Sequence, residues 1–255
     1  MGLLRDATAA LRIARAAVQG LWGLWLIRRR FPGFTQAERE ACTEQWAAGM
    51  LRILNIGLRV EGERPAGGPL LIVANHTSWL DILAVQAARR SRFIAKAEIR
   101  SWPLIGVVSD AAGTLFIERA SRRDALRTVH RTAEALASGD IVAVFPEGTT
   151  GDGTKLLPFH ANMLQAAISV GAPALPVGIH YVDAATGRPS SVATYVGDDT
   201  LMASLWRTLR AEPLCAVVRF GTPLAAGALD RRAWAQALHD EVDSLLRGPR
   251  DFATP

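Results

Sequence analysis

A histidine and an aspartate lie five positions apart in the stretch Asn75–Asp81. Both follow the apolar run Leu70–Ala74, which is typical of a buried strand, so the pair is expected where a strand ends and the chain turns. A neutral imidazole can take a proton from an alcohol as that alcohol attacks a carbonyl carbon. A carboxylate about one helical turn further on can hold the other ring nitrogen. The spacing therefore indicates that His76 is a general base oriented by Asp81; the alternative is that the two residues cap a helix.

Ser78 lies two residues after His76 and raises the hypothesis of a serine nucleophile. The Gly-x-Ser-x-Gly turn that exposes such a serine in α/β hydrolases does not surround it. A hydroxyl at the start of a helix is the favoured interpretation, because serine accepts hydrogen bonds from the first backbone N–H groups of a helix.

A second polar stretch, Phe145–Thr150, follows the apolar run Ile141–Phe145. Pro146 ends the strand, and Gly148 permits a backbone angle or a close approach that other residues resist. Glu147 is thus presented at the carboxyl end of a strand, where α/β proteins bind ligands. Its carboxylate is expected either to contact a substrate or to accept hydrogen bonds from the backbone amides of a neighbouring loop.

A charged pair follows a third apolar run, Thr114–Ile117. Arg119 offers a planar guanidinium suited to a phosphate or a carboxylate, and Glu118 could orient it or bind a hydroxyl. An ion pair at the surface is the alternative. The further arginines in 122–127 are expected on the solvated face of a helix.

Short apolar runs alternate with helical patterns from residue 58 onward, which predicts an α/β domain with a mostly parallel central sheet flanked by helices. Three units are expected: an N-terminal helical membrane-anchoring segment (1–57), the α/β domain (58–248) and a tail (249–255). The predicted strands are Leu58–Val60, Leu70–Ala74, Phe93–Ala95, Thr114–Ile117, Ile141–Phe145, Ala174–His180 and Cys215–Phe220, and the predicted helices are about 80–90, 102–109, 122–137, 160–170, 200–210 and 230–247.

The first 33 residues hold a helical pattern rich in arginine and tryptophan. Its apolar part is too short to span a membrane unless Arg12 and Arg15 are included. These arginines share one helical face with Gln19, and the opposite face is apolar. We therefore expect a helix lying in the membrane interface with its arginines toward anionic lipid; packing on the protein's own core is the alternative. The apolar face consists of Leu11, Val18, Leu21, Trp22 and Trp25.

A second helix is predicted from Thr35 to about Ile56, because Thr35 and Glu38 match a capping box. It is expected either as an amphipathic core helix or as a second membrane contact. A cleaved signal peptide is not expected, since arginines interrupt the apolar part of the first 33 residues.

The composition narrows the classes of function. The chain has 255 residues and a net charge of +5, and a basic surface suits an anionic lipid or an anionic substrate. No zinc-finger or RNA-binding signature is present, so no nucleic-acid partner is expected. Cys42 and Cys215 make neither a disulfide framework nor a metal cluster. No phosphate-binding glycine motif appears, and we expect neither a cofactor nor a metal.

Together the polar stretches resemble the motifs of the glycerolipid acyltransferases, which acylate lysophosphatidic acid and related lysolipids. Asn-His-x-x-x-x-Asp is matched by Asn75–Asp81, and Gly-x-x-Phe-Ile-(Asp/Glu)-Arg by Gly113–Arg119. Phe-Pro-Glu-Gly-Thr is matched by Phe145–Thr149, and a looser proline-containing block by Leu175–Val177. The resemblance covers roughly residues 50–225, and the order and spacing of the motifs fit.

The resemblance implies a mechanism and a set of site residues. His76 would deprotonate the free hydroxyl of a lysolipid, which would attack the thioester of acyl-CoA or acyl carrier protein without an acyl-enzyme. Asp81 would orient His76. The implied acceptor is 1-acyl-sn-glycerol-3-phosphate, giving phosphatidic acid, at the cytoplasmic face of the inner membrane with the enzyme bound as a peripheral or monotopic protein. The implied substrate-binding residues are Lys96, Glu118, Arg119 (at the acceptor's phosphate), Glu147, Gly148 and Thr149.

The chain departs from the family pattern after Glu-Gly-Thr. The lysophosphatidate enzymes usually carry arginine and then serine there, whereas this chain has Thr150 and Gly151. The stretch 147–159 is also similar to the bacterial branch that acylates lyso-ornithine lipid, an acceptor without a phosphate, which is the alternative hypothesis. A thioester hydrolase and a catalytically silent membrane-binding protein are further alternatives; the complete set of motif residues argues against the second.

Overall fold

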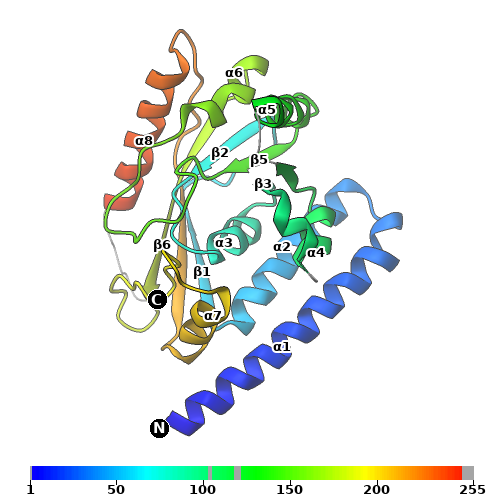
Figure 1. The fold of residues 1–255 in the computed structure, drawn as a ribbon, viewed down its shortest axis with the longest axis vertical. Helices are drawn as coiled ribbons and strands as arrows, with labels where there is room; N and C mark the ends of the chain where they lie inside the picture. The colour runs from blue at the N-terminus through cyan, green and yellow to red at the C-terminus, as the bar shows by residue number, and fades with distance from the viewer. Residues whose placement is uncertain (1, 103–104, 118–121, 249–255) are drawn as a thin grey trace.

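A seven-stranded sheet with helices on both faces forms the body of the protein (Figure 1). The computed structural model describes residues 2–102, 105–117 and 122–248. The strands are β1 (Ile56–Glu61), β2 (Leu70–Ala74), β3 (Arg92–Lys96), β4 (Leu115–Ile117), β5 (Ile141–Val144), β6 (Ala174–Asp183) and β7 (Leu214–Phe220). The helices are α1 (Gly2–Arg29), α2 (Gln36–Ile53), α3 (Leu80–Ala88), α4 (Ile105–Ala111), α5 (Arg122–Ala137), α6 (Gln165–Val170), α7 (Leu201–Arg210) and α8 (Arg231–Arg247), with short 3₁₀ helices at Phe31–Gly33, Ala97–Ser101 and Ala161–Leu164.

The sheet is mostly parallel, as predicted. Its order is β1-β7-β6-β2-β5-β3-β4, and β6 and β7 form its antiparallel pair. β2 pairs in parallel with both β5 and β6, and β3 pairs in parallel with both β5 and β4. The carboxyl ends of these strands therefore meet at one edge of the sheet, where ligands bind in open α/β folds.

The central strand β2 is buried along its whole length because helices cover both faces of the sheet. Leu70, Ile72 and Ala74 belong to the core that packs against α2, α3 and α7. Leu71 and Val73 point to the opposite face, whose core includes residues of α5, α6 and α8. A strand covered on both sides has no polar alternation, which explains the unbroken apolar run in the sequence.

The predicted capping box sets the start of α2. Thr35 Oγ1 accepts a hydrogen bond from the Glu38 backbone N–H over 3.3 Å, and Glu38 Oε2 accepts one from the Thr35 backbone N–H over 2.7 Å. The helix ends at Ile53, a few residues earlier than expected. Ala47 and Leu51 are buried, so α2 is a core helix, which was one of the two expectations.

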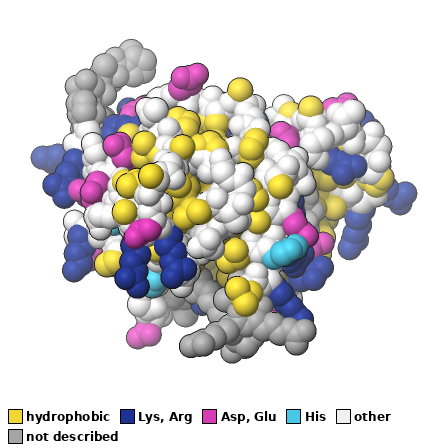
Figure 2. Space-filling view, turned by 90° about the horizontal axis from the view of Figure 1, so that it is seen from above, with side chains coloured by type: hydrophobic (Ala, Val, Ile, Leu, Met, Phe, Trp, Pro, Cys, Tyr) yellow, Lys and Arg dark blue, Asp and Glu magenta, His cyan; other side chains and the backbone are white. Residues whose placement is uncertain are grey.

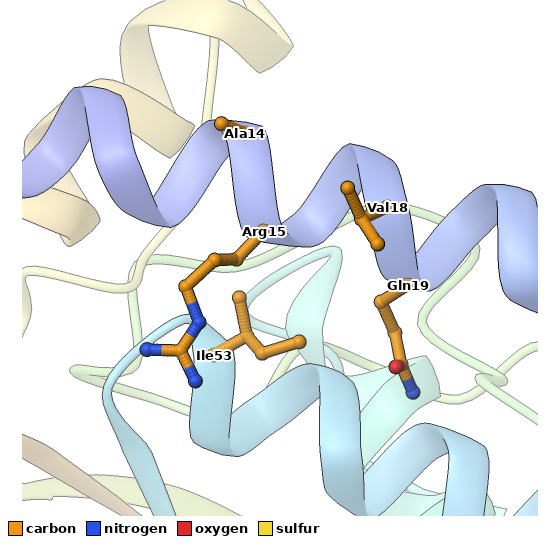
Figure 3. Close-up of a pocket in the computed structure, with 5 residues that line it drawn as sticks. All are labelled: Ala14, Arg15, Val18, Gln19 and Ile53. Carbon is orange, nitrogen blue, oxygen red and sulfur yellow. The ribbon is translucent and has the colours of Figure 1, made fainter.

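α1 packs on the protein, which was the alternative expectation, with Ile13 and Ala16 against the core. Arg12 is directed to the protein, which corrects its expected orientation toward lipid, whereas Arg15 is exposed. Arg12 Nη1 donates to the backbone carbonyl of Leu209 over 2.8 Å, and Trp46 Nε1 donates to the Gln19 carbonyl over 2.9 Å. The last carbonyls of α7 lack partners within their own helix, and Arg12 supplies one. In Figure 3, Arg15 and Gln19 extend from α1 toward α2. They border a hollow of about 300 Å³ lined by Ala14, Arg15, Val18, Gln19 and Ile53.

The five residues expected on the apolar face of α1 are all exposed. Trp22 and Trp25 stack with ring centroids 4.7 Å apart and are 50% and 43% exposed. The buried residues of the helix are small, namely Ala9, Gly20 and Gly23, so α1 packs closely on its neighbours. The expected division into a polar and an apolar face is therefore incomplete, because the side of α1 that packs on the core also carries the apolar residues Ile13 and Ala16. None of the helices in the described part of the chain has the length and apolar character needed to cross a membrane.

Charged and apolar side chains are mixed on the face seen from the top of Figure 1. Lys and Arg side chains gather in separate groups toward the edges of this view, with apolar side chains between them (Figure 2). The Lys and Arg side chains that are visible on this face thus form several groups and not one patch.

Candidate active site

The carboxyl ends of β2 and β5 bring the two predicted polar stretches together. Val73 and Val144 are partners in the register of these strands, so the residues that follow them leave the sheet side by side. His76 comes from the loop after β2 and Glu147 from the loop after β5. Glu147 Oε1 accepts a hydrogen bond from the His76 backbone N–H over 2.6 Å. The two stretches therefore form one site.

His76 and Asp81 form the pair that the sequence predicts. His76 Nδ1 lies 2.9 Å from Asp81 Oδ2, and the two side chains are 18% and 0% exposed. The same oxygen accepts hydrogen bonds from the backbone N–H groups of Thr77 (2.7 Å) and Ser78 (2.9 Å). From the first turn of α3, Asp81 thus holds both the backbone that precedes the helix and the imidazole of His76. With Nδ1 engaged as the donor to Asp81, Nε2 is the atom that can accept a proton from a substrate hydroxyl.

Ser78 has the structural role expected for it. Its side chain is buried, and its Oγ accepts a hydrogen bond from the Leu80 backbone N–H over 3.2 Å at the start of α3. The hydroxyl therefore serves the helix start and not nucleophilic attack.

An aromatic ring supports the imidazole from one side. The rings of His76 and Phe145 stack with centroids 4.0 Å apart and an angle of 9° between their planes. Phe93 packs in turn on Phe145 at 5.7 Å. The ring plane of His76 is thus fixed by Phe145 and its direction by Asp81. In the sequence, Phe145 ends an apolar run and begins the Phe-Pro-Glu-Gly-Thr motif, and neither pattern predicts its contact with His76.

Asn75 ties the loop after β2 to the neighbouring strand β6. Its Nδ2 donates to the Ile179 carbonyl over 2.9 Å, and its Oδ1 accepts from the Ile179 backbone N–H over 2.7 Å. The backbone N–H groups of Gly151 and Tyr195 donate to the carbonyls of His76 (2.8 Å) and Thr77 (2.9 Å). The backbone that carries His76 is therefore held by three other parts of the chain.

Glu147 has the second of its two expected roles. It is 5% exposed, and each carboxylate oxygen accepts a backbone hydrogen bond, Oε1 from His76 and Oε2 from Leu157 over 2.9 Å. Burial raises the pKa of Glu147, while these two hydrogen bonds and the charge of His76 oppose the shift. The carboxylate thus fastens the loop after β5 to the loop that carries His76. A contact between Glu147 and the acceptor stays a prediction.

Gly148 adopts a conformation that other residues rarely take. Its φ is +73°, and a Cβ atom there would lie 3.0 Å from Cδ2 of His160. Its backbone N–H donates to the Phe145 carbonyl over 3.1 Å and closes the turn that presents Glu147. The glycine is therefore required by the backbone, as the sequence indicated. Thr149 is exposed next to this turn.

Lys96 ends β3 at the same edge of the sheet. It is exposed, and it pairs in register with Ile117, the last residue of β4. Glu118 and Arg119 come next in the chain and lie outside the described residues. The predicted contacts of these three residues with a substrate stay predictions.

Replacing Glu147 by glutamine is expected to lower the free energy of unfolding by roughly 1–3 kcal/mol. The carboxamide has one acceptor oxygen, so its NH2 group would face the backbone N–H of Leu157 and two donors would oppose each other. Acyl transfer should fall as well, since the side chain that accepts from the His76 N–H is no longer held by Leu157. Thermal unfolding and steady-state kinetics measure both effects. Glu134→Gln, at a side chain that is 64% exposed on α5, is the matched control. Unchanged stability together with a raised acceptor KM would mean that Glu147 binds the acceptor directly.

The fold and this site define an α/β protein with a His-Asp pair at the carboxyl ends of its strands, and comparisons with known proteins place it in a family. Residues 57–180 match the Acyltransferase family. The chain is 37% identical to the lyso-ornithine lipid O-acyltransferase of Pseudomonas aeruginosa, over 97% of this chain and 96% of that protein. It is 36% identical to the 1-acyl-sn-glycerol-3-phosphate acyltransferase of Neisseria meningitidis, over 96% of each. The chain therefore belongs to the Acyltransferase family and is an acyltransferase.

A solved structure has the same fold. The crystal structure of the 1-acyl-sn-glycerophosphate acyltransferase PlsC from Thermotoga maritima aligns with a TM-score of 0.68 at 22% sequence identity. The alignment covers 96% of this chain and 100% of that one. The shared fold thus includes the N-terminal helices as well as the sheet.

Proposed function

We propose that this acyltransferase moves a fatty acyl group from an acyl thioester, acyl-CoA or acyl carrier protein, to the free hydroxyl of a lysolipid at a membrane surface. The observation that carries the proposal is the His76–Asp81 pair: an oriented imidazole, partly exposed, beside a fully buried carboxylate. Such a pair suits proton removal from an alcohol at neutral pH.

The steps follow from the geometry. Nε2 of His76 takes the proton of the lysolipid hydroxyl as its oxygen attacks the thioester carbonyl carbon. Asp81 stabilises the imidazolium that forms, because Nδ1–H already donates to its carboxylate. The tetrahedral intermediate collapses with cleavage of the C–S bond, and the imidazolium returns the proton to the departing thiolate. An ester and a free thiol are the products, and no acyl-enzyme is formed.

The acceptor that the motifs support first is 1-acyl-sn-glycerol-3-phosphate, with Arg119 as the ligand of its phosphate. The relative from Neisseria meningitidis bears the name of that activity. A second candidate is lyso-ornithine lipid. It is favoured by Thr150, which stands where the lysophosphatidate enzymes usually have arginine, and by the 37% identity to the enzyme of Pseudomonas aeruginosa.

A panel of acceptors tests this proposal. The purified protein is given acyl-CoA or acyl carrier protein thioesters with lysophosphatidate, lyso-ornithine lipid or a zwitterionic lysophospholipid, and thiol release is followed. We expect the highest kcat/KM with lysophosphatidate. Preference for lyso-ornithine lipid would select the second candidate, and acylation of none of these lysolipids would contradict the proposal.

The exposed apolar side chains of α1 support attachment to a membrane surface as a peripheral or monotopic protein. We place this attachment at the cytoplasmic face of the inner membrane. Trp22 and Trp25 are exposed on α1, in the way that tryptophans sit at headgroup depth in interfacial helices. The relatives are named as enzymes of lipid acceptors. A lysolipid would then be reached without leaving the membrane.

The double variant Trp22→Ala/Trp25→Ala is expected to bind anionic liposomes at least about tenfold more weakly, since moving each half-exposed ring out of water contributes roughly 1 kcal/mol. Sedimentation with liposomes measures this. Leu126→Ala/Leu229→Ala is the control, because these side chains are 70% and 47% exposed on other elements. Equal binding by both double variants would show that α1 is not the membrane contact.

A further inference from the structure

A phenol hydroxyl contacts the oxygen of Asp81 that does not face His76. Tyr181 lies in β6, and its Oη donates to Asp81 Oδ1 over 2.7 Å. Asp81 is 0% exposed and Tyr181 is 4% exposed, so solvent scarcely competes for this hydrogen bond. Within the described part of the chain, Tyr181 is the donor to Oδ1, while Oδ2 accepts from His76 and from two backbone N–H groups.

The surroundings of Tyr181 keep its hydroxyl protonated. Burial raises the pKa of Tyr181 well above its ordinary value, and the charge of Asp81 and the hydrogen bond between them raise it further. The phenol is therefore a neutral hydrogen-bond donor over the whole pH range in which a histidine base works.

We propose that Tyr181 is a positioning residue for acyl transfer, which fixes the plane of the Asp81 carboxylate so that Oδ2 faces His76. The proposal rests on the role of His76 as the general base. A hydrogen bond to Oδ1 also stabilises the charged carboxylate, so Asp81 holds the imidazolium proton less tightly. Tyr181 thereby helps His76 to return that proton to the leaving thiolate.

Tyr181→Phe removes the hydroxyl and little else. We expect kcat to fall about tenfold while the KM values for thioester and lysolipid stay within about twofold. We also expect the acid limb of the pH profile of kcat/KM to move about 0.5–1 unit higher, because the carboxylate that has lost a donor holds the imidazolium proton more tightly. Among the described residues, Glu147 and Tyr181 are the other titratable groups that hydrogen-bond to the pair, and Glu147 is unchanged in this variant.

Val218→Ala is the matched control. Val218 is fully buried in β7, in the same core as Tyr181, and it is the register partner of Ile179. Its truncation loosens the packing and removes no hydrogen bond. If Tyr181 acted through packing alone, both variants would lose stability and active fraction, and neither would shift the acid limb.

A second measurement covers the case in which Tyr181→Phe does not fold. The chain has two tyrosines, so 3-fluorotyrosine incorporated into Tyr195→Phe protein labels Tyr181 alone. The more acidic phenol is a stronger donor, and the acid limb should move lower than in unlabelled Tyr195→Phe. If the acid limb of the pH profile did not move in either measurement while His76→Ala was inactive, this inference would be overturned and the proposed function would stand. Transfer retained by His76→Ala would overturn both.

Discussion

Replacing His76 by alanine is expected to lower kcat for acyl transfer by about 10²–10⁴-fold, the range in which a positioned general base contributes. The fold should persist, because the backbone of this loop is held through Asn75, Glu147 and Gly151 and not through the imidazole. The KM for the thioester should change little, since the ring acts on the acceptor's hydroxyl. Steady-state assays and thermal unfolding of the same preparation measure these effects.

His130→Ala is the control for this variant. His130 lies on α5, and its side chain is 76% exposed beside Glu134. It should keep full activity. If His76→Ala kept more than a tenth of the wild-type kcat, the base would have to be another group.

Replacing Asp81 by asparagine is expected to lower kcat about 10²–10³-fold with a modest loss of stability. The amide oxygen can take the place of Oδ2 and still accept from Thr77, Ser78 and His76, and the amide nitrogen can donate to Tyr181. The geometry is thus kept and the negative charge that stabilises the imidazolium is lost. Asp81→Ala should in addition lower the free energy of unfolding by roughly 3 kcal/mol or more, because it strands two backbone N–H groups.

Asp230→Asn is the matched control for the asparagine variant. Asp230 also accepts from two backbone N–H groups at the start of a helix, here as the N-cap of α8, from Arg232 (2.8 Å) and Ala233 (2.9 Å). Asparagine caps helices nearly as well, so activity and stability should both persist. Equal activity of Asp81→Asn and the wild type would show that the carboxylate charge has no part in transfer.

The sequence predicts those parts of the fold that depend on local patterns. The predicted strands all occur, with ends that differ by up to three residues, because apolar runs bounded by breakers are a local signal. The predicted helix 160–170 begins as a 3₁₀ turn at Ala161–Leu164, and the helix expected at 102–109 lies at Ile105–Ala111. Helix ends depend on capping and tertiary contacts, which periodicity does not report.

The site residues likewise divide into those that local spacing predicts and those that only the fold brings together. His76 and Asp81 are close in the chain and follow a strand, so their pairing could be predicted from spacing. Tyr181 lies 100 residues further on, and a tyrosine within an apolar strand carries no sign of a polar partner. The predicted direction of Arg12 was wrong for a similar reason, because the carbonyl that accepts its hydrogen bond belongs to Leu209, 197 residues away. Contacts of this kind are set by the arrangement of the elements and not by the local sequence.

The dependence of thiol release on the lysolipid tests the central claim most directly. Purified protein is mixed with an acyl thioester, and free thiol and acylated lipid are measured with and without lysophosphatidate and lyso-ornithine lipid. We predict that thiol appears at a significant rate only with a lysolipid, and that one acylated lipid forms for each thiol released. Thiol release at the same rate without any lysolipid would show that His76 activates water, and would contradict the account.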